Sequence, residues 1–286
     1  MDKTNQNADV VTNGKMVARL CKGRKADVET AWRALRNEAM WVLEDEPSLA
    51  HLLEDVIFSR ATPAEALAAR LARRLAREDM PRATLEPLIR DVFTEHPLIL
   101  HGAIRDMLAI YDRDPACFSP LEPVLFFKGF LALTTYRVSH QFWNDRRRWL
   151  ALYLQSLSSE VFAVDIHPAA RIGCGIMIDH ATSFVVGETA IIEDDVSILH
   201  EVTLGGTGKE TGDRHPVIRS GVLIGAGAKI LGRVEIGTGS KVGAGSVVLE
   251  DVPAHSTVAG VPAVLVGRAG ETNPAIAMNQ LLDPGG

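Results

Sequence analysis

A six-residue periodicity of large apolar side chains is the feature that most restricts how this chain can fold. The repeated positions, nearly all aliphatic, are Ile166, Ile172, Ile178, Phe184, Ala190, Val196 and Val202, then, after a phase break, Ile218, Ile224, Ile230, Ile236, Val242 and Val248. Side chains on a strand alternate with a period of two, so a period of six implies short strands that each turn one side chain inward. Three such strands make a coil of about eighteen residues, and stacked coils form a triangular prism. The repeat therefore predicts a left-handed parallel β-helix.

Glycine follows the repeated aliphatic residue at several corners of this prism. Gly173, Gly225, Gly237 and Gly243 stand where the chain must turn tightly and a side chain is often strained. The alternative, a sandwich of ordinary strands, predicts period-two alternation with a turn at intervals of roughly 8 to 12 residues. The six-residue period favours the hexapeptide-repeat interpretation over the sandwich.

The first half of the chain has a helical pattern, so the predicted fold class is α+β. Residues 62–65 (TPAE) form a capping box with proline at the first helical position, which predicts a helix over 63–77. A second apolar pattern predicts a helix after Pro81, and others are expected near residues 27–43, 48–60, 97–111, 120–139 and 144–158. The predicted organisation is a disordered tail over 1–25, an α-helical domain over 26–160, a catalytic β-helix over 161–268 and a flexible C-terminal tail over 269–286.

Composition restricts the partners and the compartment. A formal net charge of -6 gives no indication of the excess of basic residues that nucleic-acid-binding proteins carry. The longest apolar stretch, 123–133, is interrupted by Lys128 and is shorter than the roughly 20 residues of a membrane span. Residues 1–7 (MDKTNQN) lack the apolar stretch of a secretory signal peptide, so none is expected. Cys21, Cys117 and Cys174 form no CxxC pair, so neither disulfides nor a zinc knuckle is indicated. We expect a cytoplasmic protein without nucleic-acid or membrane partners.

The repeat cannot be followed through residues 205–216 (GGTGKETGDRHP), which are predicted to leave one corner as a loop. Loops on a rigid scaffold commonly carry chemistry. The run is not a phosphate-binding loop, because Glu210 follows the lysine and Thr203 stands where the first glycine is required. The GAG tripeptides at 225–227 and 243–245 also miss the dinucleotide-binding spacing. We interpret them as corner glycines, whose bare backbone leaves a groove for an extended ligand such as a pantetheine arm.

Several polar residues of the repeat are candidates for catalysis. His180 follows Asp179 at a predicted corner, and a histidine beside a carboxylate can act as a general base near neutral pH. Asp165, expected one coil below, is placed to fix the tautomer of His180. Arg214 and His215 suit the carboxylate of a small acidic or zwitterionic substrate. The plainer alternatives are a surface histidine and a solvated charged loop.

A metal site was the other possibility for the histidines. Zinc can be bound by three histidines in a β-helical trimer, and the candidates are His167, His180, His200 and His215. Their spacing is irregular and no carboxylates are placed to support them. No metal is predicted.

Short motifs run through both halves of the chain. In the repeat they are 164–170 (VDIHPAA), 179–182 (DHAT), 186–190 (VGETA), 202–209 (VTLGGTGK), 212–216 (GDRHP) and 224–232 (IGAGAKILG). Upstream they are 113–115 (RDP), 128–130 (KGF), 136–137 (YR) and 146–147 (RR). Together, over roughly residues 30–268, they resemble the bacterial serine O-acetyltransferase family. Hexapeptide repeats alone occur in many acyltransferases, whereas a helical first half with these motifs occurs in a narrower group of proteins.

The resemblance implies transfer of acetyl from acetyl-CoA to the hydroxyl of L-serine, giving O-acetyl-L-serine and CoA in cysteine biosynthesis, with no permanently bound cofactor. It implies that His180, oriented by Asp165, removes the hydroxyl proton. It also implies that the substrate ammonium is held by Asp114 and Asp179 and the carboxylate by Arg214 and His215. The CoA contacts that it implies are Gly205, Gly206, Thr207, Ala226 and Ala244, with Lys229, Lys241 and Arg268 as candidates for the 3′-phosphate.

The resemblance also implies assembly and regulation. Family members bind CoA between neighbouring β-helices of a homotrimer, usually pair two trimers into a hexamer, and are inhibited by L-cysteine in the serine site. Many end in an isoleucine that docks into O-acetylserine sulfhydrylase, whereas this chain ends in 282–286 (LDPGG), which argues against that route. Two other functions stay open: an acyltransferase with another acceptor, where Arg214 and Asp114 argue against a sugar, and a non-catalytic β-helix that binds partners.

Overall fold

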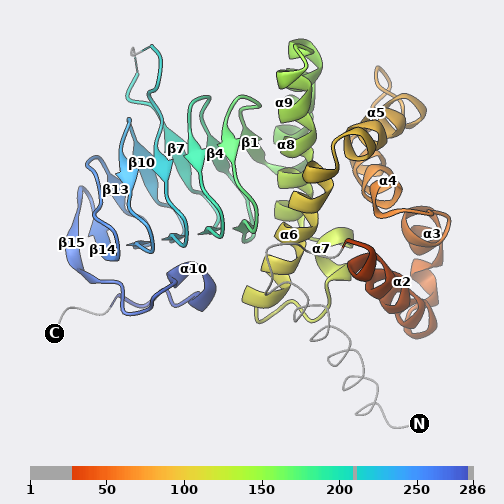
Figure 1. Cartoon of the computed structure of the whole chain (residues 1–286), viewed down its shortest axis with the longest axis horizontal. Coiled ribbons are helices and arrows are strands. Elements are labelled where there is room, and N and C mark those ends of the chain that lie inside the picture. The colour runs from red at the N-terminus through yellow and green to blue at the C-terminus, as the bar shows by residue number, and fades with distance from the viewer. Residues whose placement is uncertain (1–27, 209–210, 283–286) are drawn as a thin grey trace, which may run out of the picture. The chain divides into compact units, whose positions relative to one another are not determined.

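The computed structural model describes residues 28–208 and 211–282, which fall into two compact units. The first unit ends at Phe127 and the second begins at Lys128. The helices predicted over 26–160 are divided between these units, because the last two belong with the β-helix (Figure 1). The tail predicted over 1–25, with Cys21, lies outside the described residues.

The first unit is helical. Its elements are α2 (Val28–Asp45), η1 (Pro47–Leu49), α3 (Ala50–Leu53), η2 (Glu54–Phe58), α4 (Pro63–Leu75), α5 (Arg82–Glu95), α6 (Pro97–Arg113) and α7 (Leu121–Leu125). The N-cap half of the predicted capping box is confirmed, since Thr62 Oγ1 accepts a hydrogen bond from Glu65 N at 3.2 Å just before α4 begins. The Glu65 carboxylate differs from the prediction, because it accepts from the backbone N–H of Ala61 at 2.7 Å and not from that of Thr62. The single helix expected near 120–139 is two helices, because α7 ends at Leu125 and α8 begins at Lys128.

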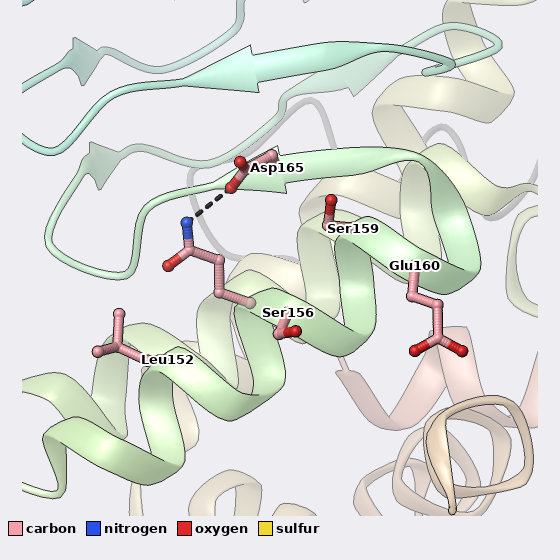
Figure 2. Close-up of a pocket in the computed structure, with 6 residues that line it drawn as sticks. Leu152, Ser156, Ser159, Glu160 and Asp165 are labelled. Carbon is pink, nitrogen blue, oxygen red and sulfur yellow. Dashed lines mark hydrogen bonds between the residues drawn. The ribbon is translucent and has the colours of Figure 1, made fainter.

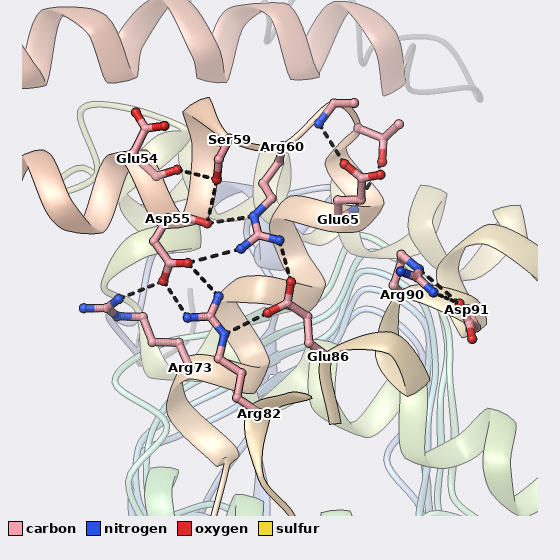
Figure 3. A network of polar contacts seen from close by, with 12 residues as sticks. Glu54, Asp55, Ser59, Arg60, Glu65, Arg73, Arg82, Glu86, Arg90 and Asp91 are labelled. Carbon is pink, nitrogen blue, oxygen red and sulfur yellow. Dashed lines mark hydrogen bonds and ion pairs between the residues drawn. The ribbon is translucent and has the colours of Figure 1, made fainter. Parts of the chain in front are cut away.

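A network of ion pairs joins η2, α4 and α5 in this unit (Figure 3). Asp55 accepts hydrogen bonds from Arg82 at 2.7 and 2.8 Å, from Arg73 at 2.8 Å and from Arg60 at 3.1 Å. Glu86 binds Arg60 at 2.5 Å and Arg82 at 2.8 Å. The hydrogen bonds from Arg82, followed by those from Arg73, hold the pKa of Asp55 well below its usual range.

We expect Asp55→Asn to lower the free energy of unfolding by about 1–2 kcal/mol at pH 7, between the values typical of exposed and buried pairs. Because the folded-state pKa of Asp55 is depressed, its contribution is complete above the unfolded pKa of about 4 and disappears as the pH falls through the folded pKa. Urea unfolding of both proteins at pH 7 and at lower pH measures this. Asp91→Asn, which removes an exposed pair with Arg90, is the matched control; equal losses in the two variants would contradict the prediction.

The second unit begins with a helical hairpin of α8 (Lys128–Asn144) and α9 (Arg148–Phe162), which packs on the first coil of the β-helix. Tyr136 Oη donates to the carbonyl of Ala170 at 2.5 Å, and Arg137 donates to the carbonyl of Gly173 at 2.6 Å. The open end of a stacked-coil protein exposes its apolar core unless a cap covers it. The hairpin is that cap, which explains why it belongs with the β-helix.

The predicted β-helix is confirmed. Its strands are β1 (Val164–Ile166), β2 (Arg171–Ile172), β3 (Met177–Ile178), β4 (Phe184–Val186), β5 (Ile191–Ile192), β6 (Ser197–Ile198), β7 (Thr203–Gly205), β8 (Val217–Ile218), β9 (Leu223–Ile224), β10 (Lys229–Leu231), β11 (Glu235–Ile236), β12 (Lys241–Val242), β13 (Val247–Val248), β14 (Ser256–Gly260) and β15 (Ala263–Arg268). They form three sheets, here called face A (β1, β4, β7, β10, β13), face B (β2, β5, β8, β11) and face C (β3, β6, β9, β12, β14, β15). All pairings are parallel except that of β14 with β15.

The core of the prism is made by the predicted inward positions, all of which are buried except Ile172, which is half-buried. The interruption of the repeat also falls where it was predicted, because residues 206–208 and 211–216 leave the prism between β7 and β8 (Figure 1). This loop lies at the corner where face A passes into face B.

Residues 269–282 differ from the flexible tail that the sequence suggests. They include α10 (Pro274–Ala277) and lie against the β-helix, where Ser197 Oγ donates to the carbonyl of Ala275 at 2.7 Å and Lys241 Nζ donates to that of Leu281 at 3.0 Å. These bonds give the segment a defined path that no periodicity in its sequence could indicate. Among residues 28–208 and 211–282, no helix has the length and apolar character needed to cross a membrane.

Candidate active site

His180 lies at the corner where face C passes into face A, called here the C–A corner (residues 179–183, 199–202, 225–228 and 243–246). Its side chain is 74% exposed, and its Nε2 lies 3.8 Å from Asp179 Oδ1. His180, Ala181 and Ser183 all have left-handed backbone conformations, with φ between 56° and 61°. Such conformations are costly for residues other than glycine, so they need a surrounding structure that fixes them. The turn between β3 and β4 thereby presents the imidazole to solvent.

His200 occupies the same corner one coil further along the prism. Its ring meets that of His180 edge to face, with centroids 5.7 Å apart. Lys128, the first residue of α8, donates from Nζ to Thr182 Oγ1 at 2.5 Å and so ties the capping helix to this turn. The predicted base and its neighbouring carboxylate are therefore held on a braced and accessible corner.

The predicted CoA contacts Ala226 and Ala244 lie in the same column of turns as His180. Backbone hydrogen bonds connect the column, from Glu201 N to Thr182 O, from Gly227 N to His200 O and from Gly245 N to Ala226 O. Adjacent strands in a sheet are about 4.8 Å apart, so Ala244 lies about 14 Å along the prism from His180. Ala244 and Gly245 are exposed, and a Cβ on Gly225 would lie 2.6 Å from Ala244 N. The small residues thus form a narrow path of accessible backbone that leads to His180.

Arg214 and His215 lie at a different corner, where face A passes into face B, called here the A–B corner (residues 167–170, 187–190 and 206–216). Arg214 Nη2 binds Glu188 Oε2 at 2.7 Å, and this hydrogen bond lowers the pKa of Glu188. Thr189 Oγ1 accepts hydrogen bonds from the backbone N–H groups of Arg214 at 3.0 Å and His215 at 3.2 Å. The loop that carries both predicted carboxylate ligands is therefore fixed by the turn of the coil below it.

The tautomer of His215 follows from its contacts. Nδ1 accepts from Thr189 N at 3.1 Å and from Thr189 Oγ1 at 2.9 Å, so the neutral ring carries its proton on Nε2. Burial, followed by the charge of Arg214, lowers the pKa of His215 and favours this neutral form. The ring packs against Gly187, where a Cβ would lie 2.0 Å from Nε2. His215 is thus an oriented N–H donor. Glu188 and Thr189 were not singled out from sequence, although both fall in the motif over 186–190.

If Arg214 and His215 bind the carboxylate of L-serine, as the resemblance implies, Thr189→Val should raise KM for serine about tenfold, because a net loss of about 1.4 kcal/mol in orienting bonds is tenfold in affinity. The KM for acetyl-CoA, the predicted co-substrate, should not change. Initial rates at varied serine and at varied acetyl-CoA measure both constants. Thr211→Val, at an exposed position of the same loop, is the control; an unchanged KM for serine in Thr189→Val would contradict the assignment.

Asp165 does not lie below His180 as the sequence argument placed it. Val164 pairs with Phe184, so the first coil is longer than eighteen residues and Asp165 lies beside Val185, at the middle of β1, which is the end strand of face A. Its Oδ1 accepts a hydrogen bond from Gln155 Nε2 of α9 at 2.6 Å (Figure 2). In the part of the chain that the structure describes, no hydrogen bond joins Asp165 to His180.

The remaining predicted residues are distributed as follows. Gly205 ends β7, and Gly206 lies against Arg214 and His215, where a Cβ would be 3.6 Å from His215 Nε2. Thr207 begins the exposed part of the loop. Asp114 belongs to the first unit, where it follows α6 and its Oδ1 accepts from Ala116 N at 2.8 Å.

Two of the cations considered for the 3′-phosphate are already engaged. Lys241 is 3% exposed, and its ammonium lies 3.0 Å from the carbonyl of Leu281 and 3.6 Å from Glu271. Lys229 Nζ donates to the carbonyl of Glu201. The four histidines also divide between corners, since His180 and His200 share one and His167 and His215 the other. Among the described residues, no three histidine, cysteine or carboxylate side chains are grouped to bind a metal ion.

The parallel prism with its loop and small-residue corners defines a hexapeptide-repeat transferase, and residues 215–250 match the family model "Bacterial transferase hexapeptide (six repeats)". Residues 31–135 match a second model, "Serine acetyltransferase, N-terminal". The serine acetyltransferase of Salmonella typhimurium is 50% identical over 254 residues, which cover 89% of this chain and 93% of the relative. The chain therefore belongs to the serine acetyltransferase family and is an acetyl-CoA-dependent O-acetyltransferase.

Solved structures agree with this assignment. The serine acetyltransferase of Brucella abortus in complex with coenzyme A is 49% identical, with a TM-score of 0.82 over 84% of this chain and 96% of that one. A serine acetyltransferase in complex with cysteine is 50% identical, with a TM-score of 0.87 over 88% of this chain and 98% of that one. Both relatives share the fold of this chain.

Proposed function

We propose that this chain acetylates L-serine at sites assembled between neighbouring copies, each site combining the C–A corner of one copy with the A–B corner of another. The division of the predicted residues between two corners supports this assembly. His180 and Asp179 lie at one end of face A, whereas Arg214 and His215 lie at the other. The strands between these corners have three residues in β1, β4 and β7, and so span about 10 Å. A substrate as small as serine cannot contact both ends within one copy.

The reaction follows from the residues of the two corners. Arg214 and the Nε2–H of His215 bind the serine carboxylate, while Asp179 and Asp114 bind its ammonium. His180 takes the hydroxyl proton as the serine oxygen attacks the thioester carbonyl carbon of acetyl-CoA. The carbon–sulfur bond then breaks, and the proton on His180 passes to the departing CoA thiolate. Catalysis on this account is positioning together with one general base.

Acetyl-CoA lies along the C–A corner in this proposal. Its pantetheine arm follows the accessible backbone at Ala226 and Ala244, and the loop residues Gly205, Gly206 and Thr207 contact it from the neighbouring copy. The path of small residues that leads to His180 supports this placement, because it delivers the thioester to the base. Asp165 is proposed to orient His180 across the same interface. Use of acetyl-CoA, an intracellular metabolite, supports the cytoplasm as the compartment.

Assembly and regulation complete the proposal. Three copies around a threefold axis provide three equivalent sites, and pairing of two such trimers gives a hexamer. L-Cysteine, which shares the ammonium and carboxylate of serine, is proposed to inhibit by occupying the same site. The complex of a relative with cysteine supports this.

The test is CoA release from acetyl-CoA with L-serine, compared with other amino acids and with sugars. Turnover with L-serine that excess cysteine suppresses is the expected result. Turnover with another acceptor alone would keep the transferase class and overturn the substrate. An absence of turnover with every acceptor would favour a non-catalytic scaffold. The molar mass in solution tests the assembly, and a monomer that is active would contradict the shared site.

A further inference from the structure

The side chain that holds Asp165 belongs to the capping helix α9, not to the β-helix. Helix α9 ends at Phe162, and a single residue, Ala163, connects it to β1 in a left-handed conformation with φ of 56°. This short connection fixes the helix against the first strand. It brings Gln155, two turns before the end of α9, beside Asp165, the middle residue of β1 (Figure 2).

The hydrogen bond between them has one possible direction. A carboxylate only accepts, so the amide of Gln155 must present its nitrogen to Asp165 Oδ1. The distance is 2.6 Å, and within residues 28–208 and 211–282 it is the one hydrogen bond that the Asp165 carboxylate accepts. The bond therefore occupies one oxygen and restricts the rotation of the carboxylate, while the second oxygen stays available.

Asp165 also borders an open recess of about 530 Å³ on the outside of the prism. Its lining is mostly polar and consists of Leu152, Gln155, Ser156, Ser159, Glu160 and Asp165. A recess of this size can admit a side chain from outside the chain. A carboxylate that only stabilises a core is surrounded by buried groups, whereas Asp165 faces this open recess.

We infer that Gln155 is a positioning residue for catalysis. It binds one oxygen of the Asp165 carboxylate, so that the other oxygen can accept the Nδ1–H of His180 from a neighbouring copy. This inference rests on the proposed role of Asp165. The capping helix then contributes to the chemistry as well as to the closure of the prism end. Loss of the amide donor lets the carboxylate rotate and leaves the histidine without a fixed tautomer.

The experiment compares Gln155→Leu, which keeps the size but removes the donor, with Ser156→Ala, a neighbour in the same recess that does not contact Asp165 through any described hydrogen bond. We expect Gln155→Leu to lower kcat by about ten- to a hundredfold, the usual effect of losing such a supporting bond. The KM values for serine and acetyl-CoA, the molar mass and the urea midpoint should stay close to those of the wild type. Ser156→Ala should keep the wild-type kcat.

Gln155→Glu provides a readout that a structural role would not move. Two carboxylates at this distance cannot both be ionised, so a shared proton restores the bond only at lower pH. The ratio of its kcat to that of the wild type should rise as the pH falls, whereas the ratio for Gln155→Leu should stay flat. The other titratable groups nearby, Glu160 on α9 and His167 after β1, are the same in every variant.

Asp165→Ala separates the two claims. If Asp165→Ala lowers kcat and Gln155→Leu does not, the role of Gln155 is overturned while the proposed active site survives. If Asp165→Ala leaves kcat unchanged, the proposed role of Asp165 fails and the inference fails with it. If both lower kcat, adding Gln155→Leu to Asp165→Ala should cost nothing further, because the amide acts only through the carboxylate. Additive losses would overturn the inference.

Discussion

Replacement of His180 by alanine should lower kcat for serine acetylation by about a hundred- to ten-thousandfold, the usual contribution of a general base. The side chain is exposed on the braced turn between β3 and β4, so its removal leaves no unfilled core. The KM for acetyl-CoA and the molar mass should be unchanged. Steady-state CoA release measures the rate.

The control for this variant is His51→Ala, at an exposed position of the first unit. It should keep the wild-type kcat. Near-normal turnover in His180→Ala would remove this residue as the base and return the C–A corner to a purely structural role. A loss of turnover together with a changed molar mass would show that the substitution had disturbed assembly instead.

If sites are shared between the subunits of a trimer as proposed, mixed trimers of two inactive variants should recover activity. When His180→Ala and Arg214→Ala subunits are refolded together in equal amounts, about a quarter of the shared sites receive an intact histidine from one subunit and an intact arginine from the next. Each variant refolded alone should remain nearly inactive. Recovery to about a quarter of the wild-type rate is a large effect against that background.

A second mixture makes this experiment decisive. Wild-type subunits refolded with subunits that carry both substitutions should also give about a quarter of the rate if sites are shared, but about half if each site lies within one subunit. A site within one subunit also predicts no recovery for the two single variants. The pair of mixtures therefore distinguishes the two arrangements without a structure of the assembly.

The repeat made the architecture predictable, because every coil places its inward residues by the same rule. Ile224, Ile230 and Ile236 belong to three different faces, yet all are fully buried. The turn that bears His180 was also predictable, since it follows the inward Ile178. These features depend on local spacing, which a single sequence displays directly.

The arrangement of the site across coils was not predictable in the same way. Spacing gives the face on which a residue lies, but alignment between coils depends on how many residues each corner absorbs. The left-handed residues around His180 lengthen the first coil, which moves Asp165 beside Val185. The burial of Lys241 depends on the path of residues 269–282, and the roles of Glu188 and Thr189 depend on where the loop returns. No periodicity encodes these contacts.

The column of turns that joins His180, His200, Ala226 and Ala244 places these residues at equal intervals along the prism. Each coil adds one step of about 4.8 Å. If acetyl-CoA lies along this column as proposed, the number of coils between the exposed backbone and the imidazole sets the length of carrier that can deliver its acyl group to His180. A thiol shorter than the pantetheine arm would leave its acetyl group short of the imidazole. Insertion of one coil between His200 and Ala226 would misplace the natural donor by the same step. Selectivity for the acyl donor then depends on the number of coils in this column.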